Sequence, residues 1–216
     1  MIRIVIADDH TIVREGLKQL LSAAEDLEVV GEARDGHEAL ARVRETEFDL
    51  LLLDLSMPGK GGPELIRQIR AEKPKLRILV LSMHAEHQYA VRAIKAGASG
   101  YLTKDSASAL LVSAIRKVAG GGAFISAEVA EQLALSSMPQ AEGLPHASLS
   151  DREYQVFRLL VSGKSVTDIA AGLNLSVKTI STHKARLMEK MGLASQTALV
   201  HYAIRHQLVD DSTAPD

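Results

Sequence analysis

Residues 49–59 read DLLLLDLSMPG, and four consecutive leucines, Leu50 to Leu53, lead directly to Asp54. An apolar run of this length is typical of a strand that is buried on both faces. The chain then turns polar and reaches Pro58-Gly59, which favours a turn. Taken alone, Asp54 is most simply interpreted as the turn residue after a core strand. Its role therefore depends on the residues that follow the other strands.

Four further runs have the length and composition of strands: Ile2–Ala7, Leu27–Ala33, Arg77–Ser82 and Gly100–Thr103. Each run is followed by a segment with apolar residues at helical spacing, and Gly120-Gly121-Gly122 stops the last of these helices. The spacing places Ile12 and Leu110 among the buried residues of the first and last helices. Five strand–helix repeats predict parallel strands joined by helical crossovers. We therefore expect residues 1–122 to form a doubly wound, five-stranded α/β domain.

The pattern changes after residue 122. Residues 123–147 are expected to hold a short helix, Ser126–Leu135, and then a linker rich in Pro, Gly and Ser. From residue 148 to 209 no strand pattern appears, which predicts a small all-α domain. Its helices are expected at Asp151–Val161, Val166–Leu173, Val177–Met191 and Ser195–His206.

Composition limits the classes of function. The 216 residues include no cysteine, which excludes disulfides, thiolate metal sites and a thiol nucleophile. The amino terminus is too short and too acidic for a signal peptide, and no apolar run approaches the ~20 residues of a membrane span. These features fit the cytoplasm and predict no membrane partner. The net charge is −2, so any surface that binds nucleic acid must be local.

Polar side chains follow four of the five predicted strands. The first strand ends at Asp8-Asp9, the third at Asp54, the fourth at Ser82 and the fifth at Lys104, whereas the second offers nothing obvious. Because ligands bind at the carboxyl ends of the strands in such sheets, we expect these groups to meet in one shallow crevice. A lone aspartate after a strand is usually a turn or cap residue, but the joint arrangement favours a chemical site.

Three clustered carboxylates repel one another and require a divalent cation. Oxygen ligands, with no histidine or cysteine expected among them, favour Mg²⁺ or Mn²⁺ over zinc. A carboxylate beside such an ion can attack phosphorus and form an aspartyl phosphate. Lys104 would then pair with the phosphoryl oxygens, and Ser82 would donate a hydrogen bond to them.

Residues 1–125 resemble the receiver domain of two-component response regulators. The resemblance rests on ADDH after the first strand, LLLDLSMPG around Asp54, LSMH at Ser82 and GYLTKD around Lys104. It implies that Asp54 accepts a phosphoryl group from a histidine kinase.

The same resemblance assigns the remaining groups of the site. It implies that Asp8 and Asp9 hold Mg²⁺ together with Asp54 and the backbone carbonyl of Ser56. Ser82 and Tyr101 match the two switch positions of the family, a hydroxyl and an aromatic ring. The space that Ser82 leaves on moving toward the phosphoryl group would admit the ring of Tyr101.

The carboxyl-terminal segment has the proportions of a helix-turn-helix. Ser150 and Glu153 form an S-x-x-E capping box, and Ser176 is a suitable cap for the second helix of the pair. A helical wheel of that second helix gathers its apolar residues on one side: Val177, Ile180, Leu187, Met188 and Met191.

The other side of this helix is polar and basic. Lys178, Thr182 and Ala185 point away from the apolar side, and Ser181 and Arg186 lie on the flanks. Lys184 falls near the apolar side, so its stem is expected to follow the core edge while its ammonium group reaches a phosphate. Such a basic helix suits the major groove of double-stranded DNA.

This segment resembles the DNA-binding module of LuxR-type regulators, through LSDRE, VSGKS, DIA, LS-x-KT and KMGL. The resemblance implies that Ser181, Thr182 and Ala185 read bases. A receiver followed by this module resembles the NarL/FixJ class of response regulators, which typically bind inverted repeats as dimers, with half-sites ~10 bp apart. The last helix, with Leu199, Tyr202 and Ala203 on one side, is either a dimer contact or ordinary core.

Two other functions compete with a phosphorylation-controlled transcription factor. A phosphatase of the haloacid-dehalogenase type also forms an aspartyl phosphate, but it needs a second acid two residues on, where this chain has Ser56. We therefore predict that the chain is not an enzyme. The third possibility is a DNA-binding dimer whose receiver acts without phosphorylation, and the complete set of phosphoryl-site residues argues against it.

Overall fold

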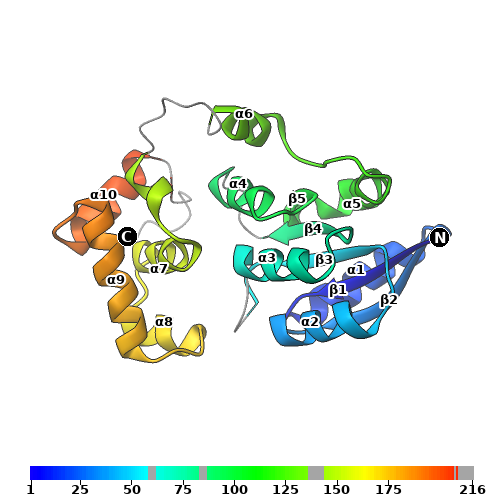
Figure 1. Cartoon of the computed structure of the whole chain (residues 1–216), viewed down its shortest axis with the longest axis horizontal. Helices are drawn as coiled ribbons and strands as arrows, with labels where there is room; N and C mark the ends of the chain where they lie inside the picture. Colours follow the sequence, from blue (N-terminus) through cyan, green and yellow to red (C-terminus); the bar gives the residue numbers. More distant parts are fainter. Residues whose placement is uncertain (58–61, 83–86, 136–143, 207, 209–216) are drawn as a thin grey trace. The chain divides into compact units, whose positions relative to one another are not determined.

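The computed structural model describes residues 1–57, 62–82, 87–135, 144–206 and 208 (Figure 1). The chain forms two compact units, Met1–Ser137 and Met138–Asp216. The turn predicted at Pro58-Gly59 and most of the predicted linker lie outside the described residues. Within the described part, no helix combines the length and the apolar character needed to cross a membrane.

The first unit alternates strands and helices in the predicted order. Its elements are β1 (Ile2–Ala7), α1 (Thr11–Ser22), β2 (Leu27–Ala33), α2 (Gly36–Glu45), β3 (Leu50–Asp54), α3 (Gly62–Glu72), β4 (Arg77–Ser82), α4 (His87–Lys95), β5 (Gly100–Thr103), α5 (Lys104–Ala119) and α6 (Ala127–Leu135). The sheet has the order β2-β1-β3-β4-β5, and every pairing is parallel. The doubly wound five-stranded fold is therefore confirmed.

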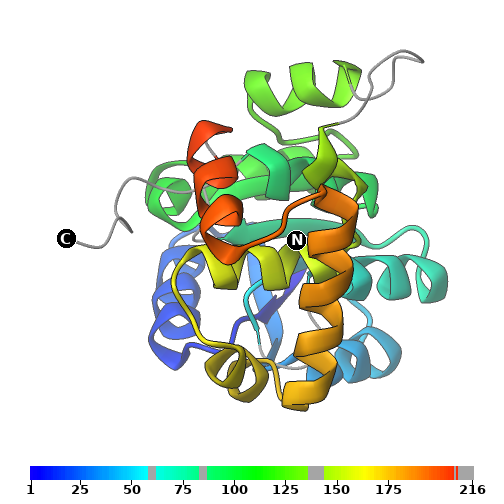
Figure 2. The same cartoon turned by 90° about the vertical axis from the view of Figure 1, so that its left-hand side faces the viewer.

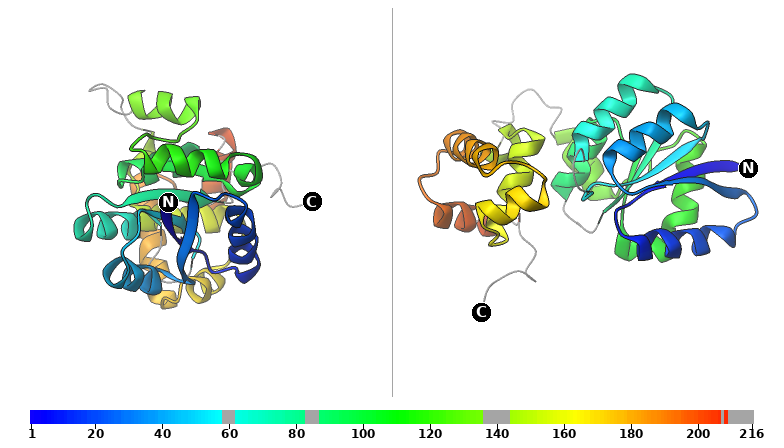
Figure 3. Two further views of the ribbon diagram at one scale, coloured as in Figure 1. Left: turned by 90° about the vertical axis from the view of Figure 1, so that its right-hand side faces the viewer. Right: turned by 90° about the horizontal axis from the view of Figure 1, so that it is seen from below.

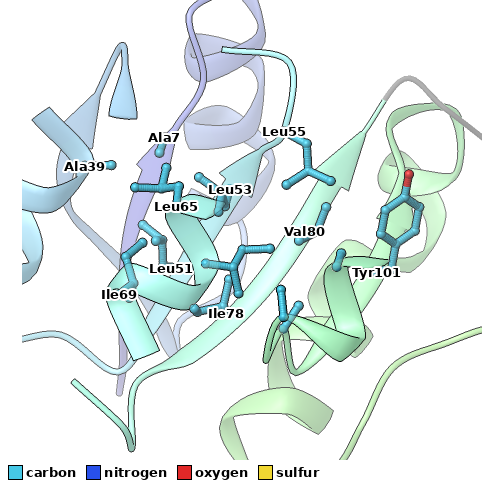
Figure 4. Packing of buried hydrophobic residues seen from close by; sticks show 14 of the residues in the cluster. Ala7, Ala39, Leu51, Leu53, Leu55, Leu65, Ile69, Ile78, Val80 and Tyr101 are labelled. Atoms are coloured by element: carbon cyan, nitrogen blue, oxygen red, sulfur yellow. The ribbon is translucent and has the colours of Figure 1, made fainter. Parts of the chain in front are cut away.

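Helices cover both faces of this sheet (Figure 3). One apolar layer joins α1 and α5 to the sheet, and the other joins α2, α3 and α4 to its opposite face. Figure 4 shows part of the second layer, in which Leu51 and Leu53 of β3 contact residues of neighbouring elements. Leu50 and Leu52 point into the first layer. The four leucines thus divide between two cores, as expected for a strand with no solvent-facing side.

β3 lies at the centre of the sheet, and Asp54 is its last residue. Its register sets Leu53 opposite both Ala7 of β1 and Val80 of β4. The ends of β1, β3, β4 and β5 consequently meet at one edge. This convergence depends on topology, because all four strands run in the same direction.

α6 belongs to the first compact unit, although the sequence pattern places it in the linker region. Its residue Val129 is buried in the same apolar layer as α4. At the preceding helix, the glycine stop is confirmed, because α5 ends at Ala119 and Gly121 adopts a left-handed φ of 93°.

Two residues predicted to be buried are exposed instead. Ile12 is 87% exposed and Leu110 is 42% exposed. Ile12 lies nine residues before the buried Leu21, which is about half a turn around the helix axis, so it faces away from the sheet. Leu110 lies at the margin of the face that Leu111 and Ile115 bury. Periodicity alone did not identify the centre of either buried face.

The second unit is entirely helical in its described part. It consists of the 3₁₀ helix η1 (Pro145–Ser148), α7 (Asp151–Val161), α8 (Val166–Gly172), α9 (Val177–Met191) and α10 (Gln196–Arg205). Figure 2 presents this group of helices to the viewer. Phe157, Ile180 and Leu199, from three different helices, are fully buried. The predicted all-α helix-turn-helix architecture is confirmed.

Side-chain caps fix where these helices begin. The predicted capping box of Ser150 and Glu153 is present, and Ser176 caps α9 by accepting from the Thr179 amide. Ser165 and Asp168 form a second capping box at α8, which the sequence analysis missed.

The buried and exposed sides of α1 provide a matched test of the first core. Leu21→Ala removes a side chain that is 1% exposed and should lower the free energy of unfolding by about 2–5 kcal/mol. Ile12→Ala, on the same helix, should change it by less than about 0.5 kcal/mol. Urea unfolding of the whole chain, followed by far-UV circular dichroism, compares the two. Equal losses would contradict the assigned orientation of α1.

Candidate functional site

The carboxyl edge of the sheet brings the predicted polar groups together. Asp8 is 2% exposed, Asp54 is 1% exposed and Ser82 is completely buried. Lys104, the first residue of α5, reaches this cluster from the end of β5. Buried polar groups of this kind are costly unless they are paired, so their gathering at one edge marks a site.

Lys104 links the two buried carboxylates. Its Nζ lies 2.6 Å from Asp8 Oδ2 and 2.8 Å from Asp54 Oδ2. Burial lowers the pKa of Lys104, but hydrogen bonds and charges from Asp54 and Asp8 outweigh this effect and leave its pKa above the usual value. The ammonium group therefore stays charged at neutral pH and neutralises part of the acidic cluster.

The second oxygen of Asp54 is held by the backbone. Asp54 Oδ1 accepts a hydrogen bond of 3.0 Å from the Ser56 amide. Ser56 is exposed, whereas the flanking Leu55 and Met57 are buried and anchor this short segment. The carboxylate of Asp54 is thus fixed at both oxygens, one by an ammonium group and one by an amide.

The prediction that no histidine lies near the acidic cluster is wrong, because His10 belongs to it. His10 Nδ1 lies 3.2 Å from Asp8 Oδ1 in a hydrogen bond, and 2.9 Å from Asp9 Oδ1 without hydrogen-bond geometry. The motif ADDH made His10 a neighbour in sequence, but the direction of its ring depends on how α1 begins. His10 is the N-cap of α1, with extended backbone, and its ring lies against the two aspartates.

The cluster can hold a metal ion. Asp8, Asp9, His10 and Asp54 each present a ligand atom, and these atoms all lie within 4.8 Å of one another. Asp9 Oδ1 is buried and accepts no hydrogen bond from the described residues. Beside the His10 ring, 2.9 Å away, this oxygen still lacks a hydrogen bond, and a cation would satisfy it. The donor set, mostly carboxylate oxygens, fits a divalent cation that prefers oxygen.

Ser82 and Tyr101 lie on neighbouring strands beside this cluster. Their hydroxyl groups are hydrogen-bonded to each other, and Tyr101 is 8% exposed. Its ring lies on the face of the sheet shown in Figure 4. Burial raises the pKa of Tyr101 to about 12, an effect that the negative charge of Asp54 adds to and the Ser82 hydroxyl opposes.

The carboxyl end of β2 offered no obvious polar candidate in the sequence, but β2 carries Glu32, which forms ion pairs with α1. Its carboxylate lies 2.9 Å from Arg14 Nε and 2.7 Å from Lys18 Nζ, both on α1. No sequence signal separated Glu32 from the many exposed acids of the chain. Its partners are 18 and 14 residues away, and only the folded chain brings them together.

On α9, the surface predicted to meet DNA is accessible. The exposed residues of the predicted set are Lys178, Ser181, Thr182, Ala185 and Arg186. Lys184 is half-buried, and its ammonium group is hydrogen-bonded to Gln196 Oε1 at 3.0 Å. Val177, predicted to pack inward, is 48% exposed. It follows directly after the N-cap, where no preceding helical turn covers it.

On the side of α10 predicted to be either a dimer contact or core, two of the three residues belong to the core of the second unit. Leu199 and Ala203 are completely buried within the second unit. Tyr202 is half-buried, and its hydroxyl group is hydrogen-bonded to His146 Nδ1 at 2.8 Å. The exposed apolar residue of this helix is Ile204, at 61%.

Burial of Tyr101 predicts an unusual alkaline titration. Tyrosinate absorbance measured against pH for the wild type, minus that for Tyr101→Phe, should show a midpoint near 12. Ordinary phenols titrate near 10. Because the folded pKa is raised, the folded state keeps a proton that the unfolded state loses, so stability should fall between pH ~10 and ~12. This fall should be smaller in the variant. A midpoint near 10 would contradict the burial of the hydroxyl group.

Comparison with known proteins identifies both units. The family described as "Response regulator receiver domain" matches residues 4–116, and "Bacterial regulatory proteins, luxR family" matches residues 147–203. The response regulator UvrY of Escherichia coli K12 is 38% identical over 214 residues, covering 99% of this chain and 98% of UvrY. The response regulator GacA of Pseudomonas viridiflava is 39% identical over 98% of this chain and 100% of its own.

A solved structure agrees with these matches. RcsB from Salmonella enterica serovar Typhimurium, bound to promoter P1flhDC in the presence of the phosphomimetic BeF₃⁻, is 33% identical. The match has a TM-score of 0.67 and covers 93% of this chain and 97% of RcsB. The chain therefore belongs to the NarL/FixJ class of response regulators, in which a receiver domain is joined to a LuxR-type DNA-binding domain.

Proposed function

We propose that a partner histidine kinase phosphorylates Asp54 and that this modification controls binding of α9 to DNA. The observation that carries the proposal is the position of the Asp54 carboxylate. It ends the central strand, lies 2.8 Å from an ammonium group, and shares an acidic cluster with Asp8 and Asp9. A buried carboxylate in this setting is suited to accept a phosphoryl group.

The cluster would hold Mg²⁺, or Mn²⁺ in its place, through Asp8, Asp9, Asp54 and the backbone carbonyl of Ser56. When bound, the ion supplies positive charge to the phosphoryl oxygens and to the attacking carboxylate. The residues of the chain do the remaining work. Asp54 would supply the attacking carboxylate oxygen, and the charged ammonium group of Lys104, 2.8 Å from that carboxylate, would pair with the incoming oxygens.

Transfer exchanges one bond to phosphorus for another. A carboxylate oxygen of Asp54 attacks the phosphorus of a phosphohistidine on the kinase, and a P–O bond forms as the P–N bond breaks. The bonding electrons of the P–N bond stay with the histidine ring, which then takes up a proton. Lys104 would remain protonated throughout, facing a phosphoryl group whose charge of about −2 replaces the single negative charge of the carboxylate.

Phosphorylation of Asp54 would change the hydrogen bond between Ser82 and Tyr101. A phosphoryl oxygen on Asp54 competes with the Tyr101 hydroxyl for the Ser82 hydroxyl, which now forms a hydrogen bond with Tyr101. Because a charged acceptor forms the stronger hydrogen bond, Ser82 should turn toward the phosphoryl group. Tyr101 then loses its partner at the end of β5. The proposed switch begins with this exchange of one hydrogen bond.

The second unit would bind DNA through α9. Ser181, Thr182 and Ala185 would face the bases, and Lys178 and Arg186 would contact phosphates. Lys184 is a further phosphate contact if it leaves Gln196, to which it is bonded here. Binding as a homodimer to an inverted repeat fits the two-fold geometry of such modules. The promoter-bound RcsB structure supports this part of the proposal.

Incubation with Mg²⁺ and a small phosphodonor should label the wild-type chain. Asp54→Asn should abolish the label, because an amide oxygen cannot form the stable acyl phosphate. Asp49→Asn is the matched control, since Asp49 directly precedes the same strand and is exposed. Mass spectrometry of the intact chain measures the label. Undiminished labelling of Asp54→Asn would refute the assignment of the acceptor.

Lys178→Ala and Arg186→Ala should each weaken DNA binding and reduce the slope of log K against log salt by about one contact. A suitable probe is a DNA duplex recovered by selection with the wild-type chain. Lys190→Met is the control, because it removes a charge from the same helix but its ammonium group lies 2.6 Å from Glu153 of α7. If Lys190→Met lowered the slope as much as the other two, the assigned DNA-facing side would be wrong.

A further inference from the structure

One arginine side chain is hydrogen-bonded to the backbone of the loop that carries Asp8 and Asp9. Arg14, on the first turns of α1, donates from one terminal nitrogen to the backbone carbonyl of Asp8 at 2.7 Å. Its other terminal nitrogen is 3.3 Å from the Thr11 hydroxyl group. The side chain is only 12% exposed, so these contacts are made in a confined space. Arg14 thus binds the peptide group of Asp8, whose carboxylate enters the metal-binding cluster.

Arg14 is in turn anchored to the sheet. Its Nε donates to Glu32 Oε2 at 2.9 Å, and Glu32 belongs to β2, the strand beside β1. The Asp8 amide donates to the Ala33 carbonyl at 3.0 Å, also on β2. The peptide nitrogen and the carbonyl oxygen of Asp8 are therefore both tied to the same neighbouring strand, one directly and one through a guanidinium group.

We infer that Arg14 is a positioning residue for the divalent-cation site, acting through the backbone of Asp8. By fixing the carbonyl of Asp8 toward α1 and β2, it fixes the direction in which the carboxylates of Asp8 and Asp9 leave the chain. The planar guanidinium group is suited to this task, because it bonds a carboxylate and a carbonyl at fixed angles that an ammonium group cannot match. The inference rests on the proposed function, in which this cluster binds Mg²⁺.

A positioning role of Arg14 and a purely electrostatic role predict opposite changes in the affinity for Mg²⁺ when Arg14 is replaced. Arg14 carries a positive charge close to a site for a cation, so removing only its charge should strengthen Mg²⁺ binding. Removing a partner that orients metal ligands should weaken binding, typically by about 10-fold to 100-fold. A change in the dissociation constant of Mg²⁺ therefore distinguishes the two roles by its direction.

Lys18 provides the matched control. It lies on the same helix, carries the same charge and contacts the same residue, Glu32, at 2.7 Å. Its ammonium group also contacts Glu15 at 2.6 Å, and no contact of Lys18 with the Asp8 backbone occurs in the described structure. Loss of Lys18 thus removes the electrostatic contribution and part of the Glu32 anchor but leaves the hydrogen bond to Asp8 in place.

Calorimetric titration of the full chain with MgCl₂ tests the inference without measuring phosphorylation. Arg14→Lys conserves the charge and should raise the dissociation constant of Mg²⁺ by about 10-fold or more. Arg14→Met should also raise it, in spite of the lost charge. Lys18→Met should leave it unchanged or lower it slightly. Thermal unfolding of each variant without Mg²⁺ confirms that the chain is folded at the titration temperature.

Phosphorylation kinetics add a second readout. At saturating Mg²⁺ the labelling rate of Arg14→Lys should recover to that of the wild type, because the defect lies in cation binding and not in the acceptor. An Arg14→Lys chain with wild-type affinity for Mg²⁺ would overturn the inference and leave the proposed function intact. A wild-type chain that binds neither Mg²⁺ nor Mn²⁺ would instead overturn the proposed function itself.

Discussion

The arrangement of polar side chains at the carboxyl edge of the receiver sheet depends on the contact of one ammonium group with two buried carboxylates. Lys104 bridges Asp8 and Asp54, which are almost completely shielded from water. Burying each carboxylate costs several kcal/mol unless a nearby charge compensates for it. Lys104 supplies that charge from the first residue of α5, so the strand-to-helix junction at Thr103 and Lys104 fixes its position. Removing the lysine would leave these two buried carboxylates without their shared ammonium group.

This requirement explains why the central strand is so apolar. The proposed acceptor at the end of β3 must be held still, because phosphoryl transfer depends on alignment. Leu50 to Leu53 anchor the strand in both apolar layers, and the neighbouring strands β1 and β4 deliver Asp8 and Ser82 beside it. The same parallel topology that buries the leucines therefore assembles the site. The burial of the leucines and the gathering of the polar groups both follow from the parallel order of the strands.

The fold and the cluster at the strand ends could be predicted because both follow from periodicity and chain direction. Run length distinguishes strand from helix, and parallel strands place their carboxyl ends at one edge. Other features depend on side-chain directions that spacing does not give. The ring of His10 joins the aspartates only because of the backbone conformation before α1, and Arg14 meets Glu32 only after α1 lies against the sheet. Ile12 was misplaced because spacing alone did not identify the centre of the buried face of α1, and Val177 because no preceding turn covers the first residue of α9.

The second unit is complete in itself, which constrains how phosphorylation can control it. Its helices begin at side-chain caps of their own, and its core is filled by residues from α7, α9 and α10. The recognition helix needs no contribution from the receiver to fold, because its N-cap and its apolar face are already satisfied. The proposed control by Asp54 would then act on the access of α9 to DNA or on the pairing of two chains, and not on the folding of α9. The proposed exchange of the Ser82 hydrogen bond at the end of β4 is a small change, and it would produce such an effect by shifting an equilibrium between arrangements that already exist.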